Sequence, residues 1–215
     1  MPNDITPNSP EGSWFSYSRD PRVPEEPPDE AYSRFTNPER FAYLHEFADA
    51  LLNRLEAEFA VERVEDYGLD PELKTVELVR PSVRLTPGDA DAAPILFKFT
   101  ASPGLEVRCG RWYRQPFPDC ACDACDETAE GEAEQLGFLV DDVTAGRFRE
   151  EIVLPVGEEA WEPAFGDAWH TSELWCPPHR RSRRSGRLHR SKARQLLAGS
   201  DRSLYEWKPW PSRIP

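Results

Sequence analysis

Apolar residues recur at steps of three and four positions across residues 41–59, which is the spacing of one face of an α-helix. The residues that form this stripe are Phe41, Leu44, Phe47, Ala48, Leu51, Leu52, Leu55 and Phe59. Helix-start signals precede the stripe, since Asn37 can cap free N–H groups and Pro38 suits the first helical position. Thr36 and Glu39 have the spacing of a capping box. The pattern predicts a helix that begins at Pro38 and ends near residue 59.

Alternating apolar and polar residues then predict strands, because successive side chains of a strand point to opposite faces. A first stretch surrounds Pro81, which favours an edge strand or a bulge at that point. Two later stretches are joined by Ser102-Pro103-Gly104 and are expected to form a hairpin. The apolar members of the three stretches are Val76, Leu78, Val83 and Leu85, then Ile95, Phe97 and Phe99, then Leu105, Val107 and Cys109.

The second half of the chain predicts fewer regular elements. We expect a helix over 133–146, a strand over 148–154, an irregular aromatic stretch over 161–175 and a short helix over 192–198. Aromatic side chains are dense over 205–211, which indicates that the end of the chain packs against the rest of the protein.

This order of elements predicts an α+β fold, with two helices packed on one face of a mainly antiparallel sheet. Residues 1–30 are rich in proline and polar side chains, so they are expected to be a disordered N-terminal segment. Residues 31–175 are expected to form the α+β domain. Residues 176–215 are expected to form a basic, aromatic tail that docks on it.

Composition places the protein in a reducing compartment. The hydrophobic share of 39% and the charged share of 30% are typical of a globular protein. The first twelve residues lack the basic start and apolar stretch of a secretory signal, and no stretch is long enough to span a bilayer. Five cysteines are an odd number, and three of them fall within six residues, unlike a secreted disulfide framework. We expect a cytoplasmic protein without a membrane partner.

The net charge of −13 is unevenly distributed. Residues 1–175 carry a formal charge of −22, whereas residues 176–215 carry +9. The arginine-rich stretch 180–187 could neutralise phosphates, or it could pack against the acidic body of the same chain. Because that body repels DNA and no groove-reading motif is present, nucleic acid is the less favoured partner, while a protein partner remains open. An interaction protein whose basic tail binds nucleic acid is therefore kept only as a second alternative function.

The sharpest chemical feature is the C-x-C-x-x-C cluster of Cys120, Cys122 and Cys125. A C-x-x-C step lets two thiolates reach one zinc ion from a tight turn, and the cluster could supply three of four tetrahedral ligands. Candidates for the fourth ligand are Cys109, His170, Cys176 and His179. Cys176 and His179 themselves form a C-x-x-H step. Zinc is the cofactor that this pattern favours.

Two other interpretations of the cluster stay open. Cys122 and Cys125 could form a redox pair if a helix N-terminus lowers a thiol pKa. The neighbouring carboxylates, among them Asp119 and Asp123, are expected to raise thiol pKa values and to favour a bound cation instead. Alternatively, the cysteines are small packed side chains without ion or reactivity.

Evidence for an enzyme is lacking in the sequence. The chain has no phosphate-binding glycine loop, nucleophile elbow or dinucleotide fingerprint, and we lean against catalysis. Acidic pairs such as Asp141-Asp142 and Glu150-Glu151 are interpreted as solvated surface. The leading functional hypothesis is a non-enzymatic binding or regulatory module with a structural zinc.

Several motifs resemble an uncharacterised actinobacterial family, a domain of unknown function. They are Ala31-Tyr32-Ser33-Arg34, Thr36-Asn37-Pro38-Glu39-Arg40-Phe41, Phe117-Pro118 with Cys120, Cys122 and Asp123-Ala124-Cys125-Asp126-Glu127, Gly146-Arg147-Phe148, and Tyr205-Glu206-Trp207 with Pro209-Trp210-Pro211. The resemblance covers the chain from about Tyr32 to the end. It implies a bacterial cytoplasmic protein and carries no activity or cofactor with it. Cys109 lies outside the similar segments, which weakens it as a fourth ligand.

Overall fold

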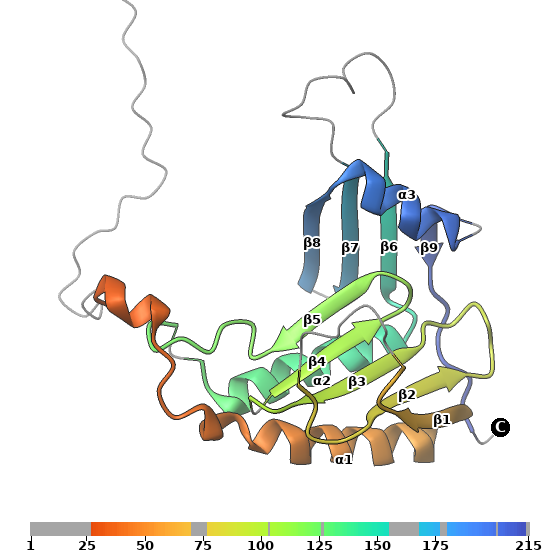
Figure 1. Cartoon of the computed structure of the whole chain (residues 1–215). Coiled ribbons are helices and arrows are strands. Elements are labelled where there is room, and N and C mark those ends of the chain that lie inside the picture. Colours follow the sequence, from red (N-terminus) through yellow and green to blue (C-terminus); the bar gives the residue numbers. More distant parts are fainter. Residues whose placement is uncertain are drawn as a thin grey trace, which may run out of the picture.

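A computed structural model describes most of the chain, and Figure 1 shows the arrangement of its elements. The described residues are 27–69, 77–102, 104–125, 127–154, 168–176, 180–200 and 202–213. For residues 168–169, 175–176, 180–188 and 190 the description is limited to the backbone. Residues 1–26, which make up most of the predicted disordered segment, lie outside the described part, and a 3-10 turn η1 (Asp29–Ser33) follows shortly after them.

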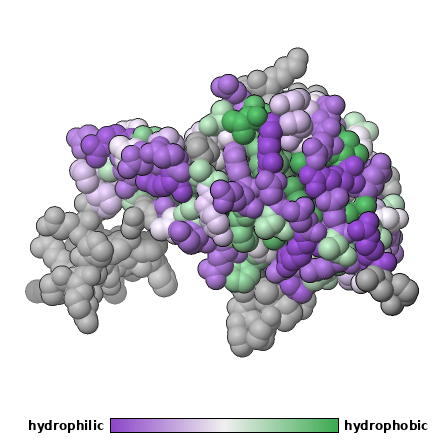
Figure 2. Space-filling model, turned by 90° about the horizontal axis from the view of Figure 1, so that it is seen from below, coloured by the Kyte–Doolittle hydropathy of each residue, from purple (hydrophilic) through white to green (hydrophobic). Residues whose placement is uncertain are grey.

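The predicted first helix is confirmed, with a different start. A 3-10 turn, η2 (Pro38–Phe41), leads into α1 (Tyr43–Glu58), whose buried residues belong to the predicted apolar stripe. Asn37 adopts a left-handed conformation with φ 50° and makes no side-chain cap. The expected capping box is also absent here, because the Thr36 hydroxyl donates to the Asp123 carboxylate instead. The exposed side of α1 is mostly hydrophilic, as Figure 2 shows from below.

The first sheet is antiparallel, in the order β1-β2-β3-β4-β5. Its strands are β1 (Val61–Asp66), β2 (Ser82–Pro87), β3 (Ile95–Thr100), β4 (Gly104–Cys109) and β5 (Tyr113–Phe117). The predicted β3–β4 hairpin is confirmed. An edge strand or a bulge was expected around Pro81. In the structure Leu78 only bridges Thr100, and the strand begins after Pro81, which has no N–H to donate. Val76 lies outside the described residues.

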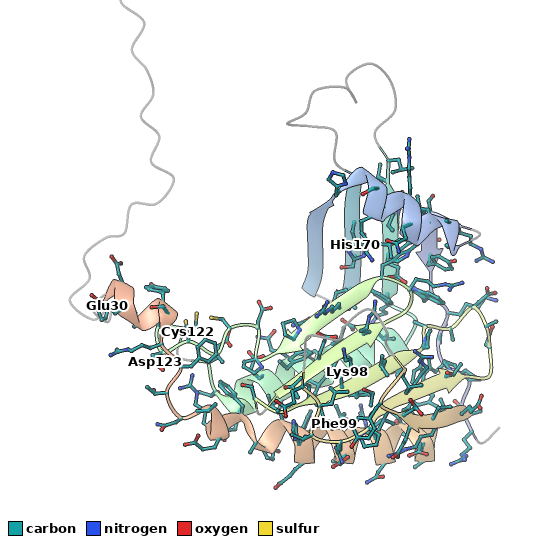
Figure 3. The ribbon with its side chains drawn as sticks, viewed as in Figure 1. Glu30, Lys98, Phe99, Cys122, Asp123 and His170 are labelled. Atoms are coloured by element: carbon teal, nitrogen blue, oxygen red, sulfur yellow. The ribbon has the colours of Figure 1, made fainter. Side chains whose placement is uncertain are left out.

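Two helices, α1 and α2 (Ala129–Thr144), cover one face of this sheet, which confirms the predicted α+β class (Figure 1). Alternation along β3 separates the two faces. Phe99 points into the helix side, where the His45 ring meets it edge-on at a centroid distance of 5.4 Å. Its neighbour Lys98 lies on the other face and pairs with Glu106 at 3.1 Å (Figure 3).

A second, four-stranded antiparallel sheet was not predicted. Its order is β8-β7-β6-β9, built from β6 (Phe148–Val153), β7 (Ala168–Cys176), β8 (Arg180–Leu188) and β9 (Leu204–Glu206), with α3 (Arg190–Ala198) beside it. The stretch 161–175 was expected to be irregular, yet its end from residue 168 onward is strand β7. The arginine-rich stretch is strand β8. Backbone pairing with β7 defines both strands, so they need no apolar alternation.

The end of the chain returns to the first sheet. The Trp210 indole donates to the Ala93 carbonyl at 2.8 Å, and the Ala60 N–H donates to the Pro211 carbonyl at 2.9 Å. Lys208 bridges Ala92 in parallel. The aromatic residues Tyr205, Trp207 and Trp210 are all buried. The C-terminal segment therefore contributes both a strand of the second sheet and a part of the main core.

Candidate metal centre

The cysteine cluster lies on the loop that joins β5 to α2. Local hydrogen bonds fold this loop into a tight turn. The Cys120 N–H donates to the Glu127 carboxylate at 3.0 Å, and the Cys125 N–H donates to the Cys122 carbonyl at 3.3 Å. Thr128 then caps α2 by accepting from the Gly131 N–H at 3.1 Å. The loop is thus anchored by a strand on one side and by a capped helix on the other.

The three sulfur atoms converge. Cys120 Sγ lies 3.2 Å from Cys122 Sγ, which lies 3.3 Å from Cys125 Sγ, and all three atoms lie within 4.8 Å of one another. Zinc–sulfur bonds of about 2.3 Å in a tetrahedral arrangement would place sulfurs about 3.8 Å apart. The Cys120–Cys122 and Cys122–Cys125 separations are about 0.5 Å shorter than that value, and the Cys120–Cys125 separation is within 4.8 Å. Cys122 is buried at 2% exposure, Cys120 is half-buried and Cys125 is exposed, so a bound ion would lie at the protein surface.

The central thiol of the cluster favours the charged form that metals bind. Hydrogen bonds from the Cys120 and Cys125 side chains lower the pKa of Cys122, and the backbone N–H groups of Ala124 and Cys125 act in the same direction. The same shared proton network raises the pKa of Cys125 to about 12. The expectation that neighbouring carboxylates raise the thiol pKa values is therefore wrong for Cys122. The two thiols and two backbone N–H groups near the Cys122 sulfur lower its pKa by more than burial raises it.

The Asp123 carboxylate, although next to Cys122 in the sequence, is engaged by Thr36 and Arg34. Its Oδ1 accepts from the backbone N–H of Thr36 at 2.9 Å and from the Thr36 hydroxyl at 2.8 Å, and its Oδ2 lies 3.5 Å from Arg34 Nε. These donors lower the pKa of Asp123. Its own N–H donates to the Arg34 carbonyl at 3.0 Å, while Arg40 Nη2 donates to the Ala121 carbonyl at 3.2 Å. The cysteine loop consequently holds the segment 34–40 in place.

Two candidate fourth ligands lie outside the cluster. Cys109 is 1% exposed in the core, where burial and the charge of Glu150 raise its pKa. His170 lies on β7, edge-on to Trp112 at 6.4 Å, and burial lowers its pKa. Figure 3 places His170 in the second sheet and Cys122 beside the turn η1, which carries Glu30. His179 and the side chain of Cys176 lie outside the described part.

Sequence reasoning missed a second cluster of converging groups around Glu150. This residue was interpreted as solvated surface, but its side chain is 0% exposed. Its carboxylate accepts from the backbone N–H groups of Arg111, Trp112 and Tyr113 at 2.6, 2.8 and 3.0 Å. Burial outweighs these donors and raises the pKa of Glu150 to about 7. Asp142 was misassigned in the same way, since it is buried and pairs with Arg147 at 2.8 Å.

Taken together, these features define an α+β protein with two antiparallel sheets and a three-thiol loop that anchors an N-terminal segment. The chain belongs to the Family of unknown function (DUF6226), whose model matches residues 9–214. A search of curated proteins and a search of solved structures each found no match to the chain. Among the described helices, none is long and apolar enough to cross a membrane.

Proposed function

We propose that this chain is a non-enzymatic binding or regulatory module in which the cysteine loop holds one structural zinc ion. The observation that carries the proposal is the convergence of the Cys120, Cys122 and Cys125 sulfurs within 4.8 Å of one another. Soft thiolates in a tight turn are the ligands that structural zinc sites use. The motif resemblance and the cysteine usage also lead us to infer an actinobacterial, cytoplasmic protein, in which thiols stay reduced.

The three thiols would bind as thiolates and release their protons to solvent. Hydrogen bonds with the Cys120 and Cys125 thiols, and then with the backbone N–H groups of Ala124 and Cys125, lower the pKa of Cys122 and favour its thiolate. Because Cys109 and His170 lie in other parts of the structure, our candidate for the fourth ligand is Cys176, the last residue of β7, or His179, which completes the C-x-x-H step in the sequence. A closed four-ligand site would be structural rather than catalytic, since catalytic zinc keeps one position for water or substrate.

The role of the ion follows from what the loop contacts. Ala121 and Asp123, which alternate with the cysteines, hold the segment 34–40 through Arg40 and Thr36. An ion that fixes the three sulfurs would also fix the backbone between them. The metal would therefore stabilise the docking of residues 34–40 on the protein. It would also stabilise the surface that residues 34–40 and the cysteine loop form together.

Zinc content and thiol accessibility test this function together. Protein purified under reducing conditions is expected to carry about one zinc per chain by mass spectrometry, with three or four thiols released on chelation. Replacement of Cys122 by serine is expected to abolish zinc retention. The matched control Cys109→Ala changes a thiol outside the loop and is expected to retain the ion. Metal-free protein of fully native stability would refute the proposal.

A thiol redox function is the second candidate. Its support is the asymmetry of the pair: the pKa of Cys122 is lowered, that of Cys125 is raised to about 12, and the sulfurs are 3.3 Å apart. Oxidation would join the two sulfurs as a disulfide and pass two electrons and two protons to a disulfide-bearing partner. Alkylation rates against pH distinguish the candidates. A rapidly alkylated Cys122 in metal-free protein that cycles reversibly with a glutathione couple supports the redox role, whereas unreactive thiols exclude it.

A further inference from the structure

A cavity of about 630 Å³ lies where the outer face of the first sheet meets the C-terminal segment. Strands β2, β3 and β4 contribute one wall, and residues 202–207, which include β9, contribute the other. Figure 1 places β9 and the cysteine loop at different ends of the molecule, so this cavity is separate from the candidate metal centre.

Arginine dominates the charged lining of this cavity. Arg84 on β2 pairs across the sheet with Leu96 on β3, and Leu96 pairs with Arg108 on β4. Cross-strand partners share a face, so two guanidinium groups flank one buried apolar side chain. Arg111 on the turn after β4 and Arg202 on the opposite wall also line the cavity, and their guanidinium carbons lie 5.7 and 5.8 Å from the centroid of the Tyr205 ring. Four arginines thus converge on a single cavity.

Three carboxylates share the lining, and two of them are engaged by cations. Lys208, which lies outside the lining, pairs with Asp91 at 2.8 Å and lowers its pKa, and Arg202 lies 3.8 Å from the same carboxylate. Glu206 lies 3.9 Å from Arg149, which is also outside the lining. Asp89 is the third. Among the described residues that line the cavity, four arginines therefore stand against three carboxylates, in a protein whose net charge is −13.

The aromatic wall of the cavity is held rigidly. Tyr205 and Trp207 stack with ring centroids 4.9 Å apart, and Trp112 meets Tyr205 edge-on at 5.3 Å. Trp207 Nε1 donates to Glu150 at 3.1 Å, and the Tyr205 hydroxyl contacts the Ser200 hydroxyl at 2.6 Å. A wall that is ordered before binding reduces the entropy lost when a ligand enters.

We propose that this cavity binds a small anion through phosphate or carboxylate oxygens, with Arg84 and Arg108 as the main contacts. Guanidinium groups present forked N–H donors that match both kinds of oxyanion, and the low polarity of the Leu96 floor strengthens these charge-assisted bonds. Such a site would give the binding module a small-molecule ligand. It does not depend on the zinc proposal, because it shares no residue with the cysteine loop.

Calorimetric titration of the full chain tests the site with two probes, inorganic pyrophosphate and citrate. At least one probe is expected to bind with one site per chain, and its identity assigns the site to phosphates or to carboxylates. The double variant Arg84→Gln, Arg108→Gln is expected to weaken binding at least about tenfold. The control Arg54→Gln alters an arginine that pairs with Asp141 between α1 and α2, and it is expected to bind as the unmodified protein does.

Three results would overturn the proposal: neither probe binds, the double variant binds unchanged, or Arg54→Gln weakens binding as much as the double variant. Circular dichroism establishes that each variant is folded. If the double variant does not fold, Arg111→Gln replaces it, because this exposed side chain lines the same cavity and should also weaken binding severalfold. Unchanged binding by Arg111→Gln would then count against the site.

Discussion

The Glu150 carboxylate on β6 accepts a hydrogen bond from the indole N–H of Trp207 at 3.1 Å, 57 residues further along the chain. The same carboxylate accepts three backbone N–H groups from the turn after β4. One buried acid thereby connects the second sheet, the β4–β5 turn and the C-terminal segment. The two sheets are joined by a polar contact as well as by the apolar core.

Substitution of Glu150 by glutamine is expected to lower the free energy of unfolding by about 1–3 kcal/mol at about pH 5, where Glu150 is protonated and both of its oxygens can still accept hydrogen bonds. An amide NH₂ group would face N–H donors at one of the two oxygen positions, leaving those donors without an acceptor. Urea unfolding monitored by tryptophan fluorescence measures the change. The neighbouring Glu151→Gln is the control, because Glu151 is partly exposed and pairs with Arg149 at the surface. It should alter stability by less than about 0.5 kcal/mol.

Stability should also depend on pH through Glu150. Burial raises the folded-state pKa of this acid from 4.5 to about 7, so the folded protein binds the proton more tightly than the unfolded chain does. The contribution of Glu150 is therefore fully present below about pH 4 and is lost as the pH rises through about 7. The stability difference between the unmodified protein and Glu150→Gln should narrow between about pH 5 and pH 8. A stability difference that widens as the pH rises would show that the four hydrogen-bond donors lower the pKa of Glu150 more than burial raises it.

The two helices and strands β2, β3 and β4 of the first sheet could be predicted, because their apolar residues recur with the period of a helix or a strand. Strand β1 (Val61–Asp66) was not predicted, since its side chains are mostly exposed and carry little apolar signal. The α1 stripe and the alternation of Phe97 and Phe99 are set by which side chains face the core. Strand β8 has no such signal, since its residues are almost all arginine and serine without apolar alternation, and the strand is defined by pairing with β7. Glu150 was missed for a related reason: a charged residue is buried only when distant donors converge on it, and those donors are not adjacent in sequence.

For the cysteine loop, the sequence alone predicted that the three sulfurs come together, because the spacing itself brings them close. The contact between Asp123 and Thr36 could not be predicted, since it joins residues 87 positions apart. Thr36 and Glu39 matched a capping box, and the tertiary contact prevailed over that local preference. The fourth ligand remains a prediction for the same reason, because every candidate depends on long-range placement.

Gly110 is expected to tolerate no side chain. Its φ is +62°, and a Cβ atom would overlap the Glu150 carboxylate and approach Trp207 Nε1 to 2.9 Å. Gly110→Ala is therefore expected to destabilise the protein by at least about 2 kcal/mol in urea unfolding. Gly137→Ala is the matched control. Gly137 lies within α2, and a Cβ there would be at an ordinary distance of 3.7 Å from the Phe47 ring of α1. That control should stabilise by up to about 1 kcal/mol. Equal effects of both substitutions would contradict this interpretation of Gly110.

Asp123→Ala is expected to release the segment 34–40 without unfolding the core. The substitution removes the acceptor of the Thr36 N–H and hydroxyl and the ionic partner of Arg34. Hydrogen exchange at the Thr36 amide should accelerate, while amides of β3 and β4 keep their protection. Glu134→Ala, at an exposed position of α2, serves as the control and should leave Thr36 protected. Uniform acceleration across the sheet would instead assign Asp123 a role in global stability.

Removal of zinc is expected to reproduce the effect of Asp123→Ala in the unmodified chain. If the ion fixes the three sulfurs, its loss loosens Ala121 and Asp123, which hold the segment 34–40, and leaves the sheets intact. Hydrogen exchange before and after chelation should then show faster exchange at Thr36 and unchanged exchange in β3. In the Cys122→Ser variant, which lacks a central ligand, chelation should have no further effect. A chelator that leaves Thr36 exchange unchanged in zinc-loaded protein would separate the metal from the docking of this segment, because the loop would then hold its shape through hydrogen bonds alone.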